Sequence, residues 1–265
     1  MNRRTKRLTS LTTLAAVGAL AIAGCGGEGE SAEGEVGLGA LDGEAGAEGE
    51  SEGEGGAVNG DPATDDAAYI HLLGMTRGHL IAFYELYRAG AHEMSMPHAK
   101  HPSSELYASL EPAINARGQG GFADELTRLA ETAPSGGDIE EAYQRVVTAI
   151  DAHMPRTTVA TTLLGVAAIV RTGGDEFKIG VSDEGAITNA HEYQDAFGFL
   201  NASRDILSSI QTSDVDETEA IAVAHEQIEA ALASFDALTV DRTEGSASTL
   251  YGAAARIEIA ARGLK

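Results

Sequence analysis

The strongest constraint on this sequence is a helical spacing of apolar residues that runs from about residue 61 to the end of the chain. Apolar side chains recur at intervals of three and four residues, and alternating runs of β-branched residues are almost absent. Because one face of an α-helix repeats at this interval, the pattern predicts an all-α fold. We expect a single domain over residues 61–265, a helical bundle of about seven to eight helices.

Proline and glycine set the expected ends of these helices, since both residue types interrupt helical patterns. The helices are expected at residues 63–93, 102–117, 121–133, 138–154, 157–172, 183–211, 215–236 and 246–263. The run from Thr157 to Val170 is apolar or small on every side, which predicts a central position in the bundle.

The first 24 residues have the pattern of a secretion signal peptide. Four basic residues precede an apolar run from Leu11 to Ala23. The following Ile22-Ala23-Gly24-Cys25 resembles a bacterial lipobox, after which the chain is cut and the cysteine is lipidated. We therefore expect a lipoprotein, anchored to a membrane through Cys25 and facing the periplasm of the cell envelope. A soluble secreted protein cut near the same place is the alternative.

Residues 25–60 begin with the lipidated cysteine and continue as a Gly- and Glu-rich segment with ten acidic residues and no basic one. Such a composition cannot bury a core, so we expect a disordered tether. As a Gly-rich coil it would span roughly 30 to 35 Å. Because Cys25 is the only cysteine, the domain beyond it has no thiol for disulfides, thiolate ligation or nucleophilic catalysis.

The chain is strongly acidic, with 41 acidic and 18 basic residues and a formal net charge of −23. With the signal and tether set aside, residues 61–265 remain near −17. This charge argues against nucleic acid or anionic lipid as a partner and favours cations or cationic proteins. A saline habitat explains the same charge equally well.

A segment rich in metal-ligating residues, HEMSMPHAKHPSSE, spans residues 92–105. We interpret it as a loop, interrupted by prolines, that binds a metal ion. Pro102 fits the first position of the next helix, which places His101 at its cap and Glu105 one turn later. His98 lies three residues before His101, an interval common between two nitrogen ligands.

His79 lies at the centre of the apolar face of the first expected helix, so its side chain should be buried. Gly74 and Gly78 flank this face and would let another helix or a ligand approach. A core histidine with one hydrogen bond is the alternative interpretation. The metal ligands predicted from the sequence are His79, His98, His101 and Glu105, with Glu85 and Glu192 as further oxygen ligands.

Nitrogen and carboxylate ligands of this kind fit iron or zinc. Copper is the main rival, because Met94 and Met96 lie beside His98 and thioethers suit Cu(I).

Three other histidines are interpreted differently. His153 is expected on the buried side of a helix end, and His191 with Asp195 as an exposed pair spaced i, i+4. His225 begins an H-E-x-x-E sequence that lacks the second histidine of a zinc protease, so this activity is rejected.

The segment DEFKIGVSDEGAITNAHEYQD, residues 175–195, resembles part of the periplasmic helical domain associated with bacterial high-affinity iron permeases. The shared pattern includes Ile179-Gly180-Val181, Asn189 and Glu192-Tyr193. The resemblance implies a helical periplasmic module associated with iron acquisition, and an iron permease or other uptake component as a possible partner. The permeases' membrane segments with their glutamate-bearing motif are not found here, so we do not expect transport by this chain alone.

The chain is also similar in architecture to imelysin-like iron lipoproteins, although Glu93 directly follows His92 and so does not fit their G-x-H-x-x-E motif. We therefore expect a lipid-anchored periplasmic protein that binds a transition metal, with iron first, for uptake or sensing. A copper-binding lipoprotein and a metal-free structural or interaction lipoprotein are the alternatives. An enzyme is not expected, although a di-metal oxidase within a bundle stays open.

Overall fold

The computed structural model describes residues 60–135 and 137–264, except for the side chain of Glu105. The signal sequence, Cys25 and the tether up to residue 59 lie outside the described residues. The elements are α1 (Asp66–Arg88), α2 (His92–His101), the π-helical turn η1 (Pro102–Leu106), α3 (Tyr107–Ala116), α4 (Ala123–Ser135), α5 (Ile139–His153), α6 (Val159–Gly180), α7 (Ala190–Ser209), α8 (Val215–Leu232) and α9 (Ala247–Gly263). The predicted all-α, single-domain bundle is confirmed, since the described residues contain only two isolated antiparallel bridges besides the helices.

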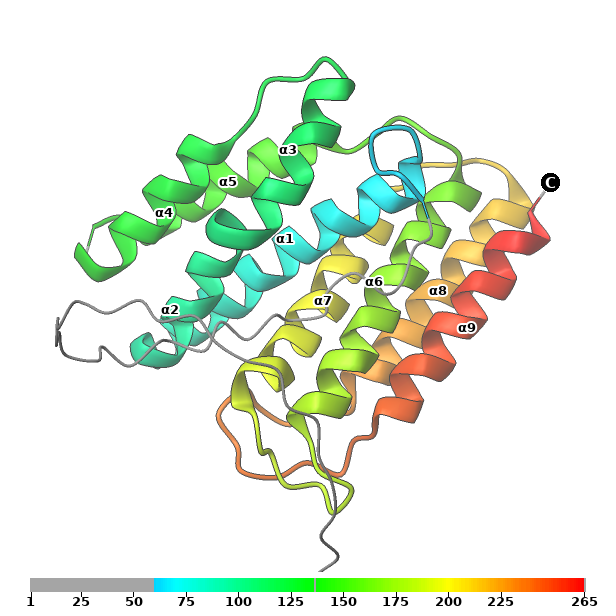
Figure 1. Ribbon diagram of the computed structural model, residues 1–265. Helices are drawn as coiled ribbons and strands as arrows, with labels where there is room; N and C mark the ends of the chain where they lie inside the picture. Colours follow the sequence, from blue (N-terminus) through cyan, green and yellow to red (C-terminus); the bar gives the residue numbers. More distant parts are fainter. Residues whose placement is uncertain (1–59, 136, 265) are drawn as a thin grey trace, which may run out of the picture. The chain divides into compact units, whose positions relative to one another are not determined.

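Helices α6 to α9 form a four-helix bundle in which each helix packs on the next and α9 closes back onto α6 (Figure 1). Their inward faces share one apolar core, which includes Leu163, Val166, Phe199, Leu200, Ile228, Leu250 and Ile257. Helix α6 also contacts α1, so it is surrounded on several sides. This agrees with the apolar run that predicts a central helix here.

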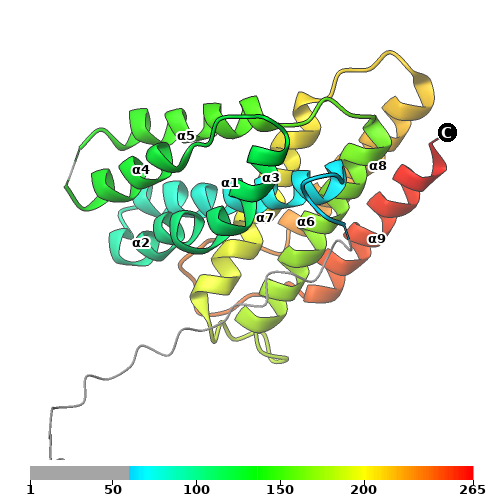
Figure 2. The same cartoon turned by 45° about the horizontal axis from the view of Figure 1, so that its top comes forward.

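The N-terminal helices form a second layer with a core of its own. Helix α1 lies against α6 and α7 on one side and supports α2 to α5 on the other (Figure 2). The second core includes Tyr69, Leu73, Leu80, Phe83, Leu110, Leu126 and Val146. Because α1 contributes to both cores, it is buried around most of its circumference. Its sequence therefore shows more apolar positions than a single amphipathic face needs.

Two glycines allow α1 and α7 to approach closely. A Cβ atom added at Gly198 would lie 2.2 Å from the carbonyl oxygen of Gly78, and one added at Gly78 would lie 2.9 Å from the backbone nitrogen of Phe199. Backbone atoms cannot move away as a flexible side chain can. The contact therefore requires glycine at both positions.

The loop expected between the helices at residues 63–93 and 102–117 is wrong in its secondary structure. The chain forms α2 there and continues through η1 into α3, with Pro97, Pro102 and Pro112 inside this helical path. Each proline removes a backbone donor and favours a kink, and the π-helical turn absorbs part of this distortion. Packing of α2 on α1, α4 and α7 maintains the helix despite the prolines.

Two further helix ends differ from the expected ones. Helix α6 continues through Gly173 and Gly174 because these glycines make room for α7 and for the ring of Tyr251 in α9, rather than ending the helix. Helix α7 begins at Ala190 instead of residue 183, with the side chain of Asn189 accepting a hydrogen bond from the backbone of His191.

None of the helices in the described part of the chain is both long enough and apolar enough to cross a membrane.

We predict that Gly198→Ala destabilises the protein by about 2 kcal/mol, because the added methyl group meets the backbone of Gly78 and overpacking typically costs this much. Gly252→Ala is the matched control, because its Cβ would contact only the flexible end of Arg256. Helix propensity alone should make that variant more stable by up to about 1 kcal/mol. Urea denaturation followed by circular dichroism measures the stability of both variants. Equal denaturation midpoints for Gly198→Ala and Gly252→Ala would contradict the predicted close contact.

Candidate metal centre

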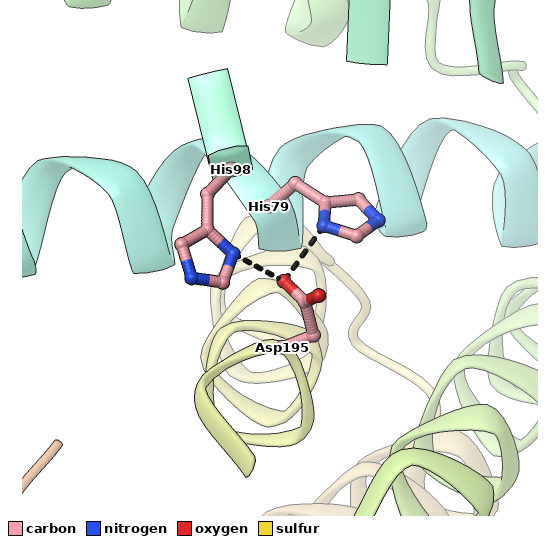
Figure 3. A group of neighbouring side chains, drawn as sticks. All are labelled: His79, His98 and Asp195. Atoms are coloured by element: carbon pink, nitrogen blue, oxygen red, sulfur yellow. Dashed lines mark hydrogen bonds and ion pairs between the residues drawn. The ribbon is translucent and has the colours of Figure 1, made fainter. Parts of the chain in front are cut away.

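Asp195 of α7 is the centre of a buried cluster of imidazole and carboxylate groups. Its side chain is only 1% exposed. The Nδ1 atoms of His79 and His98 each lie 2.7 Å from the same oxygen, Asp195 Oδ1 (Figure 3). The two histidines come from α1 and α2, so three helices supply one group of donor atoms.

The close approach of α1 and α7 explains how His79 reaches Asp195. His79 follows Gly78 directly, and Asp195 lies one helical turn before Gly198, so both side chains leave their helices beside the glycine contact. The ring of Phe199 packs edge-on against His79 at a centroid distance of 5.0 Å. Apolar packing on this side fixes the imidazole and keeps water away from it.

The orientation of His98 is fixed from both sides of its ring. Its Nδ1 faces Asp195, and its Nε2 lies 2.9 Å from Gln194 Oε1. The amide nitrogen of Gln194 donates to the carbonyl oxygen of Leu238, which directs the amide oxygen towards His98. Such outer partners hold a ligating histidine in place in many metal sites.

A second group of donors surrounds the other oxygen of Asp195. The Nε2 atom of His191 lies 3.6 Å from Asp195 Oδ2, and the Nδ1 atom of His191 lies 3.8 Å from Glu192 Oε1. His101 completes the cluster, with ring centroids 5.5 Å from His79 and 4.9 Å from His191. Four histidines and two carboxylates therefore meet between α1, α2 and the first turns of α7.

The electrostatics of the cluster keep its carboxylate ionised. Burial alone would raise the pKa of the Asp195 carboxyl, but the imidazoles of His79 and His98 hold the pKa well below its ordinary value. Burial lowers the pKa of the His191 imidazole, yet the neighbouring carboxylates of Glu192 and Asp195 outweigh this and raise the pKa. The site therefore presents a negative charge in a place closed to water.

The donor set fits a transition metal on one observation in particular. The buried Asp195 Oδ2 and His191 Nε2 atoms have no hydrogen-bond partner. Buried polar atoms nearly always have a hydrogen-bond partner, so two such atoms that face each other at 3.6 Å without a hydrogen bond need an explanation. A cation between them would supply it, and imidazole with carboxylate is a donor combination that iron and zinc accept.

Among the ligands predicted from the sequence, His79, His98, His101 and Glu192 meet in this cluster. Glu85 does not join it, because its side chain is 43% exposed and lies 3.7 Å from Arg88 in an ion pair.

Glu105 lies in η1, and its side chain is outside the described residues. Met94 is 36% exposed, and Met96 packs on the N-terminal core.

The interpretation of His191 and Asp195 as an exposed pair is wrong. Asp195 is buried and His191 is only 21% exposed, because α1 and α2 cover the face of α7 that points away from the four-helix core. The wheel of α7 predicts one buried face and does not reveal this second one. The small residues Gly198 and Ala202, which lie on the same side of the helix as Asp195, are the signal that indicates a second packed helix.

The remaining buried histidines have structural partners. Both ring nitrogens of His153 lie within 2.7 Å of backbone carbonyl oxygens, those of Ala149 and Gly120, which confirms its predicted buried position at a helix end. His71 lies 2.9 Å from the hydroxyl of Thr172.

We predict that Asp195→Asn lowers the free energy of unfolding of the metal-free protein by about 3 kcal/mol, because it removes the charge that two buried histidines face. Asp183→Asn, in an exposed position of the loop before α7, should change it by less than about 0.5 kcal/mol. Urea denaturation in the presence of a chelator compares the two variants. If Asp195→Asn loses no more free energy of unfolding than Asp183→Asn, the interaction of the Asp195 charge with the two histidines does not stabilise the protein.

Comparison with known proteins identifies a relationship for one part of the chain. The chain matches no curated protein and no solved structure. Residues 153–261 match the family of the iron permease-associated 4-helix bundle domain. This range contains α6 to α8 and all but the last two residues of α9. It includes His191, Glu192 and Asp195, whereas His79, His98 and His101 precede it. The C-terminal four-helix bundle is thus similar to a domain associated with iron permeases, which links the protein to iron uptake.

Proposed function

We propose that this protein is a lipid-anchored periplasmic protein whose helical domain binds a transition metal, with iron as the natural ion, and presents it to or senses it for an uptake system. The metal is held between α1, α2 and α7 by His79, His98 and Asp195. His101, His191 and Glu192 stand beside them as further donors.

The observation that carries the proposal is the pair of Nδ1 atoms, from His79 and His98, that converge at 2.7 Å on one fully buried carboxylate oxygen. A buried ionic network is a poor way to stabilise a fold, because apolar residues of similar volume usually do as well or better. A cluster that persists in the interior and leaves donor atoms unpaired is better explained by a ligand.

The donor types favour iron or zinc over copper. Imidazole and carboxylate groups make up the cluster, whereas Met94 is 36% exposed and Met96 packs on the N-terminal core. The family match of the C-terminal bundle supports iron as the natural ion. The acidic balance of the chain supports the proposal as well, since it raises the local concentration of cations near the domain.

Membrane attachment is the second part of the proposal and rests on the sequence around Cys25. A tether of 35 residues would allow the domain to stand roughly 30 to 35 Å from the anchor. From that distance the domain could reach an uptake component embedded in the membrane. The match to an iron permease-associated domain supports such a component as the partner.

The metal-binding proposal predicts a stoichiometric, tight complex of the chelator-treated protein with Fe(II) under anaerobic conditions and with Zn(II). Replacing a ligand should cost at least about 100-fold in affinity, since even outer partners of ligands change affinity 10- to 100-fold. His79→Ala and His98→Ala should both show this loss in isothermal titration calorimetry. Cu(I) should bind more weakly than Zn(II) once competition with a chelator is accounted for.

His225→Ala is the control for this experiment, because His225 lies on α8 outside the cluster. It should bind as the unchanged protein does. If the unchanged protein binds no metal more tightly than the His79→Ala and His98→Ala variants, the metal-free interaction lipoprotein is the better description.

The anchoring proposal predicts that Cys25→Ser moves the protein from the membrane fraction to the soluble fraction of the cell envelope. Ser31→Ala, a change in the tether that leaves the tetrapeptide intact, should leave the distribution unchanged. Fractionation after an alkaline wash, with mass spectrometry of the N-terminal peptide, measures both. A Cys25→Ser protein that stays with the membrane would refute the lipid anchor.

A further inference from the structure

The two carboxylate oxygens of Asp195 face two different groups of donor atoms. Oδ1 lies 2.7 Å from the Nδ1 atoms of His79 and His98, whereas Oδ2 lies 3.6 Å from His191 Nε2. Among the described residues, two sets of three metal-competent side chains fulfil the same distance condition. They are His79, His98 and Asp195 in one set and His191, Glu192 and Asp195 in the other. Asp195 is the shared member.

The geometry on the Oδ2 side suits an ion rather than a hydrogen bond. A distance of 3.6 Å between His191 Nε2 and Asp195 Oδ2 is too long for an N–H···O bond, and neither atom has another hydrogen-bond partner. Two ligands of one ion, with bonds near 2.1 Å and angles of about 90° to 120°, stand roughly 3.0 to 3.6 Å apart. The observed distance falls at the upper end of this range.

The two sets of donors lie side by side. The rings of His98, from the first set, and His191, from the second, are 4.3 Å apart between centroids, with their planes inclined by 33°. Ions bound by the two sets would therefore be close neighbours.

We propose that the site holds two divalent transition-metal ions bridged by the carboxylate of Asp195, an inference that rests on the metal-binding function proposed above. His79, His98 and Asp195 Oδ1 bind the first ion, for which their 2.7 Å separations must widen to at least roughly 3.0 Å. His191, Glu192 and Asp195 Oδ2 bind the second. A bridging carboxylate sets the two ions roughly 3.5 to 4 Å apart, the usual separation in two-metal sites.

The two positions differ in their access to solvent. His79 and His98 are fully buried, whereas the side chain of His191 is 21% exposed. The second ion therefore lies nearer to solvent and should exchange faster. Chelator treatment should remove the pair in two phases, with the His191 ion leaving first.

The experiment uses the full chain purified in detergent, depleted of metal and then loaded with Mn(II) or Zn(II). Elemental analysis after gel filtration should give two ions per chain for the unchanged protein, one for His191→Ala and none that survives filtration for Asp195→Asn. The Mn(II) form should show the closely spaced multiline electron paramagnetic resonance spectrum of a coupled pair, and His191→Ala should show that of an isolated ion. His225→Ala should retain both ions.

Glu192→Gln provides a second way to weaken the outer position if His191→Ala folds poorly, which circular dichroism would reveal. It should speed the release of one ion and leave the other unchanged. One ion per chain in both the unchanged protein and His191→Ala overturns the paired site and leaves the proposed metal-binding function standing. Two ions in both proteins place the second ion elsewhere and also overturn the pair. No bound ion in the unchanged protein overturns the proposed function itself.

Discussion

The contact between Gly78 and Gly198 is the constraint on which the His and Asp cluster around Asp195 depends. A helix pair that meets through larger side chains is held about 8 to 10 Å apart between axes, and a short aspartate then reaches little beyond the side chains at the interface. With a Cβ atom sterically excluded on both helices, α1 lies against the backbone of α7, and His79 and Asp195 are within hydrogen-bonding distance. Gly78 and Gly198, in the middle of their helices, thus determine how closely the side chains of His79 and Asp195 approach each other.

The position of α1 between two cores explains why the domain tolerates a charged cluster in its interior. Apolar contacts on one side join α1 to the four-helix bundle, and contacts on the other side join it to α2 through α5. The ionised Asp195 is therefore compensated locally by imidazoles, while the stability of the fold comes from apolar burial on either side. The cluster can serve a ligand because apolar burial on either side of α1, and not the cluster itself, supplies most of the stability of the fold.

The fold class, the central place of α6 and the burial of His79 could be predicted from the sequence, because helical periodicity records burial against the nearest partner. The place of Asp195 could not. Its helix is buried on two faces, and the second face is lined by alanine and glycine, which carry little hydrophobic signal. The prolines around His98 indicated a loop, whereas packing on α1 and α7 retains a kinked helix there. Convergence of residues more than ninety positions apart, such as His98 and Asp195, is a tertiary property that no local pattern records.

The kinked helical path from α2 into α3 has a consequence for how the centre can open. Three prolines along it leave fewer backbone hydrogen bonds than α1 or α7 have, and η1 replaces the ordinary ladder where α2 ends. Segments with fewer such bonds unfold locally at the lowest free energy. His98 and His101 are thus carried by a helical path with fewer backbone hydrogen bonds than the helices that carry His79 and Asp195. Local opening of that path would separate His98 and His101 from Asp195, while α1 and α7 would keep their packing.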